Sequence, residues 1–313
     1  MLKQRVITAV ILGSVVITAV LLLPYEYFSL MIALIVLLGA WEWLDLIDVQ
    51  SKKQRALFIG SMIFMMLFIH LWTYFLETLV PVFDYLAEKF KFVMEDIRKQ
   101  SGLLEWLVVP PVLFWVLVML LIRRTPDELL KLQLRLRYKV FIGWFVLLAA
   151  WMFLSRLRTF YGSEMALYLM VLIWVADIAA YFSGKKWGKT KLSPEISPGK
   201  TVEGVMGALA SAAVCAIVWH IAVNPDKSSY LTGNKILMMG ASDFILLSVL
   251  TVLISVYGDL FFSLVKRQRG VKDSGTLLPG HGGVLDRIDS LIAAIPFFYA
   301  GIFMIYYWII PAE

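Results

Sequence analysis

The chain has 313 residues, of which 60% are hydrophobic and 17% are charged, and its formal net charge is +6. Soluble domains are nearer half apolar and a quarter charged, whereas here long uncharged runs alternate with short basic stretches. These features exclude a soluble globular domain and predict an all-α, polytopic membrane protein. The single cysteine, Cys215, excludes an internal disulfide and a multi-thiolate metal site.

Apolar runs of about 20 residues predict about nine transmembrane helices, because backbone polar groups must be paired within lipid and the alternating strands of a barrel are absent. We interpret residues 1–23 as a retained first helix rather than a cleaved signal peptide. The N-terminal region, 1–165, holds helices one to five, and the C-terminal region, 166–313, holds helices six to nine with loops 183–201 and 263–290. The predicted spans are 6–23, 28–46, 57–76, 104–122, 140–154, 166–182, 202–223, 244–262 and 291–310.

The segment 77–102, between the third and fourth spans, is mixed in charge and amphipathic. Phe83, Leu86, Phe90 and Val93 recur at helical spacing. This pattern predicts an interfacial helix on the outer face of the membrane, with no role in chemistry.

The distribution of lysine and arginine predicts the orientation of the chain. Of the 29 such residues, about 21 fall on the side of the N-terminus and about 8 on the other side. Basic loops remain in the cytoplasm, so the N-terminus and both loops of the C-terminal region are expected there. We therefore expect a multi-pass protein of the inner membrane with its active site on the cytoplasmic side.

Polar residues that can carry chemistry gather at the predicted end of helix eight and start of helix nine. Asp259, Ser263 and Lys266 share one helix face if helix eight continues that far. Asp286 and Asp289 stand where helix nine should begin, after a glycine-rich turn whose N–H groups could approach phosphate oxygens. Carboxylates mixed with cations in this way predict a site for Mg²⁺ and a polyphosphate.

Plainer explanations exist for several of these residues. Asp286 or Asp289 could cap helix nine, since acids favour helix N-termini, and Lys266 could belong to the positive-inside pattern. Asp177, near the end of helix six, could pair with a loop lysine, and His281 could shape its turn or bind phosphate rather than transfer a proton. Asp259 closes an apolar run, where an ionisable group is costly and usually functional.

The tripeptide Gly199-Lys200-Thr201 matches the end of a Walker A loop. That motif requires a glycine where this chain has Pro194. No strand is expected before the tripeptide either, so we predict no P-loop. Gly204 and Gly207, which follow, indicate close packing between helices instead.

The segment from Ser263 to Asp289 resembles the signature of the phosphatidate cytidylyltransferases, also called CDP-diacylglycerol synthases. The first loop is similar to the same family in its Asp-x-x-Ala-Tyr-Phe and Ser-Pro-x-Lys-Thr-x-Glu-Gly stretches. Close resemblance covers roughly residues 177–289; the first five helices share only hydropathy and the pair Glu42-Trp43. The matching elements are Ser263, Lys266-Arg267, Lys272-Asp273, Pro279, His281-Gly282-Gly283 and Asp286-Arg287-Ile288-Asp289.

The resemblance implies a nucleotidyltransferase that makes CDP-diacylglycerol from CTP and phosphatidic acid with Mg²⁺ and room for a second cation. We expect the lipid bilayer as its setting, a homodimer, and no nucleic-acid partner. Asp259 and Asp286 are the expected metal ligands, with Asp289 as an additional or supporting ligand. The expected catalytic residues are Asp259, Lys266, Arg267, Lys272, Asp286, Arg287 and Asp289, and the expected substrate-binding residues are Asp177, Ser197, Lys200, Thr201, Ser263, His281, Gly282 and Gly283.

Three other functions would leave their own marks in the sequence. A CTP-dependent polyprenol or phytol kinase would need a general base for its alcohol acceptor, and the full signature argues against it. A CDP-alcohol phosphotransferase would carry an Asp-Gly-x-x-Ala-Arg pattern, which the sequence lacks. A transporter would place ionisable residues near the membrane midplane and often show internal repeats, whereas here the acids gather at one interface.

Overall fold

The computed structural model describes residues 13–90, 103–223, 240–277 and 282–305. Within these ranges, seven helices are long and apolar enough to cross a membrane. The predicted polytopic, all-α architecture is therefore confirmed, while the count of nine spans is not. The seven lie in α2 (Tyr25–Leu46), α3 (Lys52–Phe90), α7 (Leu136–Tyr161), α8 (Ser163–Trp187), α9 (Val202–Val223), α10 (Ala241–Arg269) and α11 (Leu285–Met304).

The two remaining predicted spans are shorter in the described part of the chain. The first is a helix over Gly13–Leu22, and residues 6–12 of that span lie outside the described residues. The fourth is divided into α4 (Leu103–Trp106) and α5 (Val109–Arg124), with prolines in the first turn of α5. Proline has no N–H and is favoured in the first turn of a helix, where the N–H would have no partner within the helix, so a new helix begins there.

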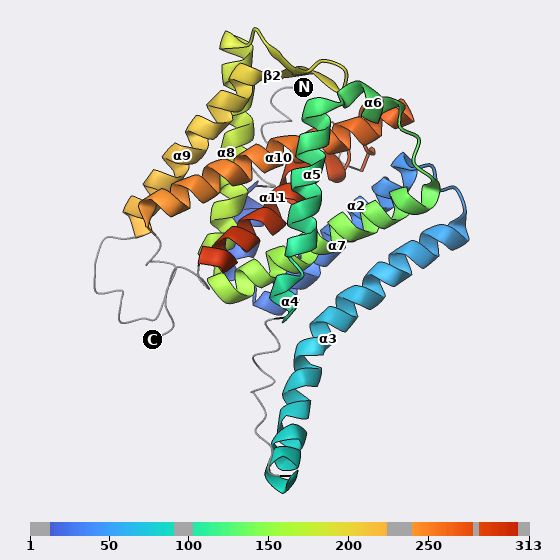
Figure 1. Cartoon of the computed structure of the whole chain (residues 1–313), viewed down its shortest axis with the longest axis vertical. Helices are drawn as coiled ribbons and strands as arrows, with labels where there is room; N and C mark the ends of the chain where they lie inside the picture. Colours follow the sequence, from blue (N-terminus) through green and yellow to red (C-terminus); the bar gives the residue numbers. More distant parts are fainter. Residues whose placement is uncertain (1–12, 91–102, 224–239, 278–281, 306–313) are drawn as a thin grey trace.

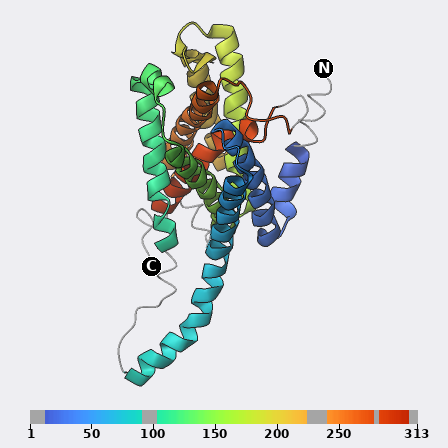
Figure 2. The same ribbon diagram turned by 90° about the vertical axis from the view of Figure 1, so that its right-hand side faces the viewer.

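Helix α3 corrects the prediction for the segment after the third span. The span was expected to end at residue 76, with a separate interfacial helix over 77–102. Instead α3 continues to Phe90 and contains Pro81, which gives it 39 residues and a length of about 58 Å. Figures 1 and 2 show it leaving the bundle and extending beyond it. The reason is that residues 77–90 include charges but no glycine, and charge alone does not end a helix. Residues 91–102 lie outside the described ranges.

The helices from α7 onward follow the predicted spans, and most of them have longer ends. Helix α9 has the predicted bounds, and α7 extends beyond the predicted 140–154. Helix α10 continues seven residues past the predicted end and stops at Gly270, whose φ of 78° is left-handed. Helix α11 begins at Leu285 rather than at residue 291, so its first turns contain Asp286 and Asp289; residues 306–310 of that predicted span lie outside the described ranges.

A two-stranded antiparallel hairpin connects α8 to α9. Strand β1 (Lys191–Ser193) pairs with β2 (Ser197–Thr201), and α9 begins at the next residue. The expectation that no strand precedes Gly199-Lys200-Thr201 was therefore wrong. The prediction of no P-loop now rests on Pro194 alone, which stands where that motif needs its first glycine.

Close helix packing places the ends of these helices next to one another. A Cβ on Gly207 would lie 2.0 Å from the Ser183 hydroxyl oxygen of α8, which confirms the packing predicted for this glycine. A Cβ on Gly258 of α10 would lie 2.5 Å from the Cβ of Ala293 in α11. Helix α10 contacts α9, α11 and α5, so it runs through the middle of the bundle (Figure 1).

Candidate active site

The two polar loops predicted from the sequence meet at one end of the bundle. The Arg267 guanidinium donates from Nε to the Ile196 carbonyl oxygen of the hairpin at 3.3 Å. Lys200 of β2 pairs with Asp259 of α10, and Lys266 of α10 pairs with Asp286 of α11. The hairpin, the C-terminal end of α10 and the N-terminal end of α11 therefore lie together (Figure 1).

Asp259 lies at the junction of the hairpin and α10. Its Oδ2 is 2.7 Å from the Lys200 ammonium, and its Oδ1 accepts a hydrogen bond from the Ser263 hydroxyl at 3.3 Å. The Lys200 and Asp259 side chains are 24% and 29% exposed. This ion pair is partly open to a ligand, and α10 does continue far enough to place Asp259, Ser263 and Lys266 on one face.

Two further carboxylates, Asp177 and Asp289, lie near Asp259. We call these three residues the acidic group. Asp259 lies within electrostatic range of both Asp177 of α8 and Asp289 of α11. The Ser290 hydroxyl donates to Asp177 Oδ2 at 3.4 Å. Three carboxyl side chains from three helices thus gather beside Lys200, an arrangement that attracts cations.

Asp286 has a different environment, although it is only three residues from Asp289. Its Oδ1 is 2.7 Å from the Lys266 ammonium, and its Oδ2 accepts from the backbone N–H groups of Ser274 and Gly283 at 2.8 and 2.9 Å. The Lys266 ammonium is 3.9 Å from Asp289 Oδ2. A carboxylate offers about four acceptor positions, so Asp286 has few left for a metal ion.

Glu42 of α2 binds the same loop and was not among the predicted site residues. Its Oε1 accepts from the Val284 N–H, and its Oε2 accepts from the Leu285 N–H and the Ser274 hydroxyl, at 2.9, 2.9 and 2.8 Å. The residue is only 2% exposed. The sequence did carry a signal for it, because an acid within an apolar span is costly and usually functional.

The predicted residues of the first loop divide into those facing α10 and those that hold the loop itself. Lys200 reaches Asp259, whereas the Thr201 hydroxyl accepts from the Gly204 N–H at 3.1 Å and is buried at the start of α9. Ser197 opens β2 and is half-buried. Thr201 therefore acts as a helix cap, and Lys200 is the residue of this loop that reaches the acidic group.

The predicted residues of the second loop differ in exposure and in what they contact. Lys272 and Arg287 are exposed, and Gly283 is buried with its N–H bonded to Asp286. Gly282 has a φ of 82°, and a Cβ there would lie 2.8 Å from Asp286 Oδ2, so glycine is required. His281, predicted to bind substrate, lies outside the described residues, as does Pro279.

The chemistry of the donor set fits a hard cation that is shared with a substrate. Within the described ranges, no group of three or more His, Cys, Asp or Glu side chains is placed to hold a metal ion. Mg²⁺ does not need such a cage, because it commonly takes one or two carboxylates and completes its shell with phosphate oxygens and water. Asp259 and Asp289 are oxygen donors of the kind it prefers.

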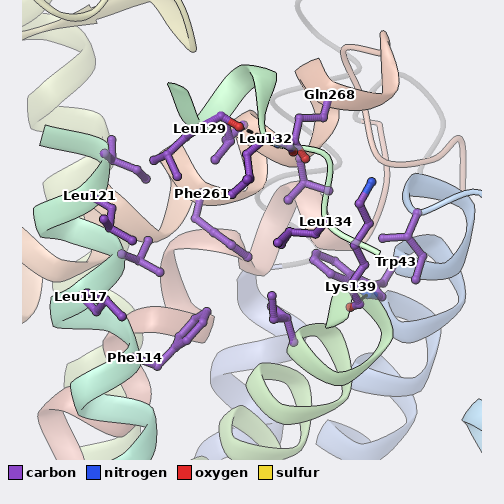
Figure 3. Close-up of a pocket in the computed structure, with 16 residues that line it drawn as sticks. Trp43, Phe114, Leu117, Leu121, Leu129, Leu132, Leu134, Lys139, Phe261 and Gln268 are labelled. Atoms are coloured by element: carbon purple, nitrogen blue, oxygen red, sulfur yellow. Dashed lines mark hydrogen bonds between the residues drawn. The ribbon is translucent and has the colours of Figure 1, made fainter. Parts of the chain in front are cut away.

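An apolar cavity of about 170 Å³ lies on the other side of α10, and Figure 3 shows its lining. By helical periodicity, Phe261, Leu264 and Gln268 project opposite to Asp259 and Lys266. The Gln268 amide donates to two backbone carbonyls at the cavity edge, at 2.7 and 3.1 Å. Helix α10 separates this cavity from the acidic group, so it is not part of the same site.

Comparisons with known proteins identify the family of the chain. Residues 3–305 match the model of the cytidylyltransferase family. The chain is 38% identical over 306 residues to a phosphatidate cytidylyltransferase of Haemophilus influenzae, covering 95% of this chain and 97% of that protein. It is 36% identical to one of Pseudomonas aeruginosa, covering 96% of each chain. A third, from Bacillus subtilis, is 42% identical over 142 residues, covering 44% of this chain and 47% of that protein. The chain therefore belongs to the cytidylyltransferase family.

Proposed function

We propose that this protein transfers the cytidylyl group of CTP to phosphatidic acid, giving CDP-diacylglycerol and pyrophosphate. The observation that carries the proposal is the meeting of the hairpin, α10 and α11 around alternating carboxylates and lysines. It occurs in a chain similar over nearly its whole length to two phosphatidate cytidylyltransferases. A membrane protein of this kind reaches its lipid substrate from within the bilayer.

The reaction needs positioning and charge neutralisation more than proton transfer. An oxygen of the lipid phosphate forms a bond to the α-phosphorus of CTP, and the bond from that phosphorus to the bridging oxygen breaks, so pyrophosphate leaves with the electron pair. The attacking phosphate is already anionic at neutral pH, and no strong general base is required. Holding the two phosphates together and offsetting their charge therefore supplies most of the rate enhancement.

We propose that carboxylates of the acidic group hold Mg²⁺. When bound, Mg²⁺ offsets the negative charge of the phosphates and orients their oxygens. Asp259 remains the first candidate ligand, since it is partly exposed. The sequence predicts Asp286 as the second ligand, but Asp286 already accepts three hydrogen bonds. These bonds favour Asp289 instead, whose Oδ1 accepts the neighbouring Ser290 N–H. A second cation remains part of the proposal.

The basic residues would bind the two phosphate groups. In the structure, Lys200 and Lys266 neutralise aspartates at 2.7 Å. Lys200 can turn toward phosphate oxygens once a cation occupies Asp259, and Lys266 would contact phosphate from its place beside Asp286 and Asp289. Asp177 would face the bound nucleotide from α8. The other proposed contacts to CTP or to the lipid phosphate are Arg267, Lys272, Arg287, Ser197, Thr201, Ser263, His281, Gly282 and Gly283.

We also propose that this end of the bundle faces the cytoplasm, with the protein in the inner membrane as a homodimer. The excess of lysine and arginine on the loops of this side supports the orientation, and CTP is available in that compartment. Cysteine-accessibility labelling of the hairpin in intact cells tests the orientation, and sedimentation of the detergent-solubilised protein tests the dimer.

The deciding experiment supplies purified protein with labelled CTP and phosphatidic acid over a Mg²⁺ titration. We expect lipid-linked CMP and an equal amount of pyrophosphate, both dependent on Mg²⁺. Labelled γ-phosphate transferred to a lipid alcohol would instead indicate a CTP-dependent kinase and overturn the proposal. A reaction that proceeds equally well without phosphatidic acid would overturn it too.

A further inference from the structure

We propose that Glu42 is a positioning residue for the reaction, acting by holding the loop that precedes α11 in the shape that places Asp286 and Lys266. This inference rests on the proposed function. Glu42 comes from α2 in the N-terminal region, 242 residues before Val284. Within the described residues, its hydrogen bonds come from the loop and the start of α11 and not from the acidic group.

The Glu42 side chain is buried, and its hydrogen-bond partners among the described residues are all donors. It is 2% exposed, and no ion pair within the described residues includes it. Its acceptor bonds come from a hydroxyl and from the N–H groups of Val284 and Leu285 at the start of α11. A helix N-terminus carries partial positive charge, which compensates a buried carboxylate without a cation.

Glu42 and Asp286, the loop-binding carboxylates, hold the loop from two sides. Ser274 links them, because its N–H donates to Asp286 and its hydroxyl donates to Glu42. At the other end of the loop, the Gly283 N–H donates to Asp286, and the next two N–H groups donate to Glu42. If Glu42 no longer binds its donors, Ser274 and Gly283 can shift, and Asp286 loses the backbone contacts that fix its angle toward Lys266.

The loop has glycines at the two positions where its backbone passes closest to the Glu42 carboxylate. A Cβ on Gly275 would lie 2.6 Å from Glu42 Oε1, and a Cβ on Gly283 would lie 2.3 Å from Glu42 Oε2. Both distances are below any real contact to a Cβ, so glycine is needed at the two positions where the loop backbone passes the carboxylate. The two glycines and the serine together form a socket for one carboxylate.

The charge of Glu42 matters as well as its shape. Glutamine has the same size, but its amide nitrogen donates and cannot accept. In Glu42→Gln, one of the three donors must therefore lose its acceptor, whichever way the amide turns. A buried polar group without a partner moves or opens to water, and here the groups that move belong to the loop next to Asp286.

The experiment compares Glu42→Gln with Glu105→Gln in the full-length protein. Glu105 of α4 is a matched control, since it is a shielded glutamate 3.2 Å from Arg156 at the opposite end of the bundle. We expect both variants to lower Tm. Only Glu42→Gln should lower kcat, by about 10- to 100-fold, because small misplacements of reacting groups cost that much. Glu105→Gln should keep the kcat of the parent protein.

Hydrogen–deuterium exchange supplies a readout that does not depend on activity. Glu42→Gln should raise exchange in the peptide that contains Val284 and Leu285, with α8 and α9 unchanged. A kcat equal to that of the parent protein, or a loss matched by Glu105→Gln, would overturn the proposal. If Glu42→Gln does not fold, Ser274→Ala removes one donor and leaves the Asp286 contact, and it should lower kcat in the same direction. An inactive parent protein would refute the proposed function instead, and the exchange experiment would still test the contact.

Discussion

The acidic group and the loop-binding carboxylates contain the same kind of side chain at the same end of the bundle, yet they are built for different tasks. Asp259 is 29% exposed and contacts one lysine and one hydroxyl. Asp286 and Glu42 each accept three hydrogen bonds, mainly from backbone N–H groups. A carboxylate with free acceptor positions can hold a cation, whereas one whose positions are filled holds the protein chain. Because these carboxylates differ in how many acceptor positions are filled, residue type alone does not identify a metal ligand here.

Asp259→Asn should lower activity and leave stability almost unchanged. The substitution removes the charge that attracts the cation, so we expect turnover to fall by about 100-fold or more. Tm should change little, because the Lys200 pair is partly exposed and contributes little to stability. The measurement is Mg²⁺-dependent formation of lipid-linked CMP beside thermal unfolding in detergent.

Asp243→Asn is the control for Asp259→Asn, since Asp243 lies in the first turn of the same helix at its other end. It should keep the activity of the parent protein. Full activity in Asp259→Asn would remove this residue from the site.

Asp286→Asn should lower stability as well as activity. The Lys266 and Asp286 side chains are each only 10% exposed, so loss of one charge leaves a shielded ammonium and costs about 3 kcal/mol. We expect Tm and turnover to fall together, unlike in Asp259→Asn. Differential scanning fluorimetry beside the activity assay distinguishes them, and an unchanged Tm would show that Asp286 does not hold the loop.

Gly258→Ala should disturb both sets of carboxylates through the packing of the helices that carry them. The added Cβ would lie 2.5 Å from the Ala293 Cβ and 3.1 Å from the Asp289 carbonyl oxygen. Forcing α10 and α11 apart should cost about 1–3 kcal/mol and lower turnover. Gly60→Ala in α3 is the matched control, because no atom lies within 4 Å of its Cβ position; thermal unfolding should show no loss there. Equal Tm values in the two variants would contradict the close approach.

Asp48→Asn tests an exposed carboxylate, and of these substitutions it should change Tm and activity least. Asp48 lies between α2 and α3 with a φ of 62°, which asparagine also adopts. A hydrogen bond from Gln50, aided by Arg269, lowers the pKa of Asp48 below its usual value. A depressed folded-state pKa contributes stability at neutral pH that disappears as pH falls through that pKa.

The Tm difference between Asp48→Asn and the parent protein should therefore be small at pH 7, begin to shrink near pH 4, the ordinary pKa of an aspartate, and vanish once pH falls below the lowered pKa. A difference that grows on acidification would contradict this sign.

Hydropathy was sufficient to locate most of the helices, while their ends required more. The range of α9 was predicted at both ends, because a span in lipid must be apolar and flanked by polar residues. The end of α10 was missed, since Lys266 and Arg267 remain helical beyond the apolar run until Gly270. The continuation of α3 through Pro81 was not predicted, because hydropathy drops at residue 77 although the helix continues.

The sequence by itself determined that this is a polytopic helical membrane protein, and it placed Asp259, Lys266, Asp286 and Asp289 near one another. Those results follow from short-range rules: apolar length sets a span, and neighbours at helical spacing share a face. The packing of the helices, in contrast, determines which carboxylates keep acceptor positions open for a cation. Glu42 reaches a loop 242 residues away, and no spacing rule predicts which backbone N–H groups will fill an acceptor once the helices have packed.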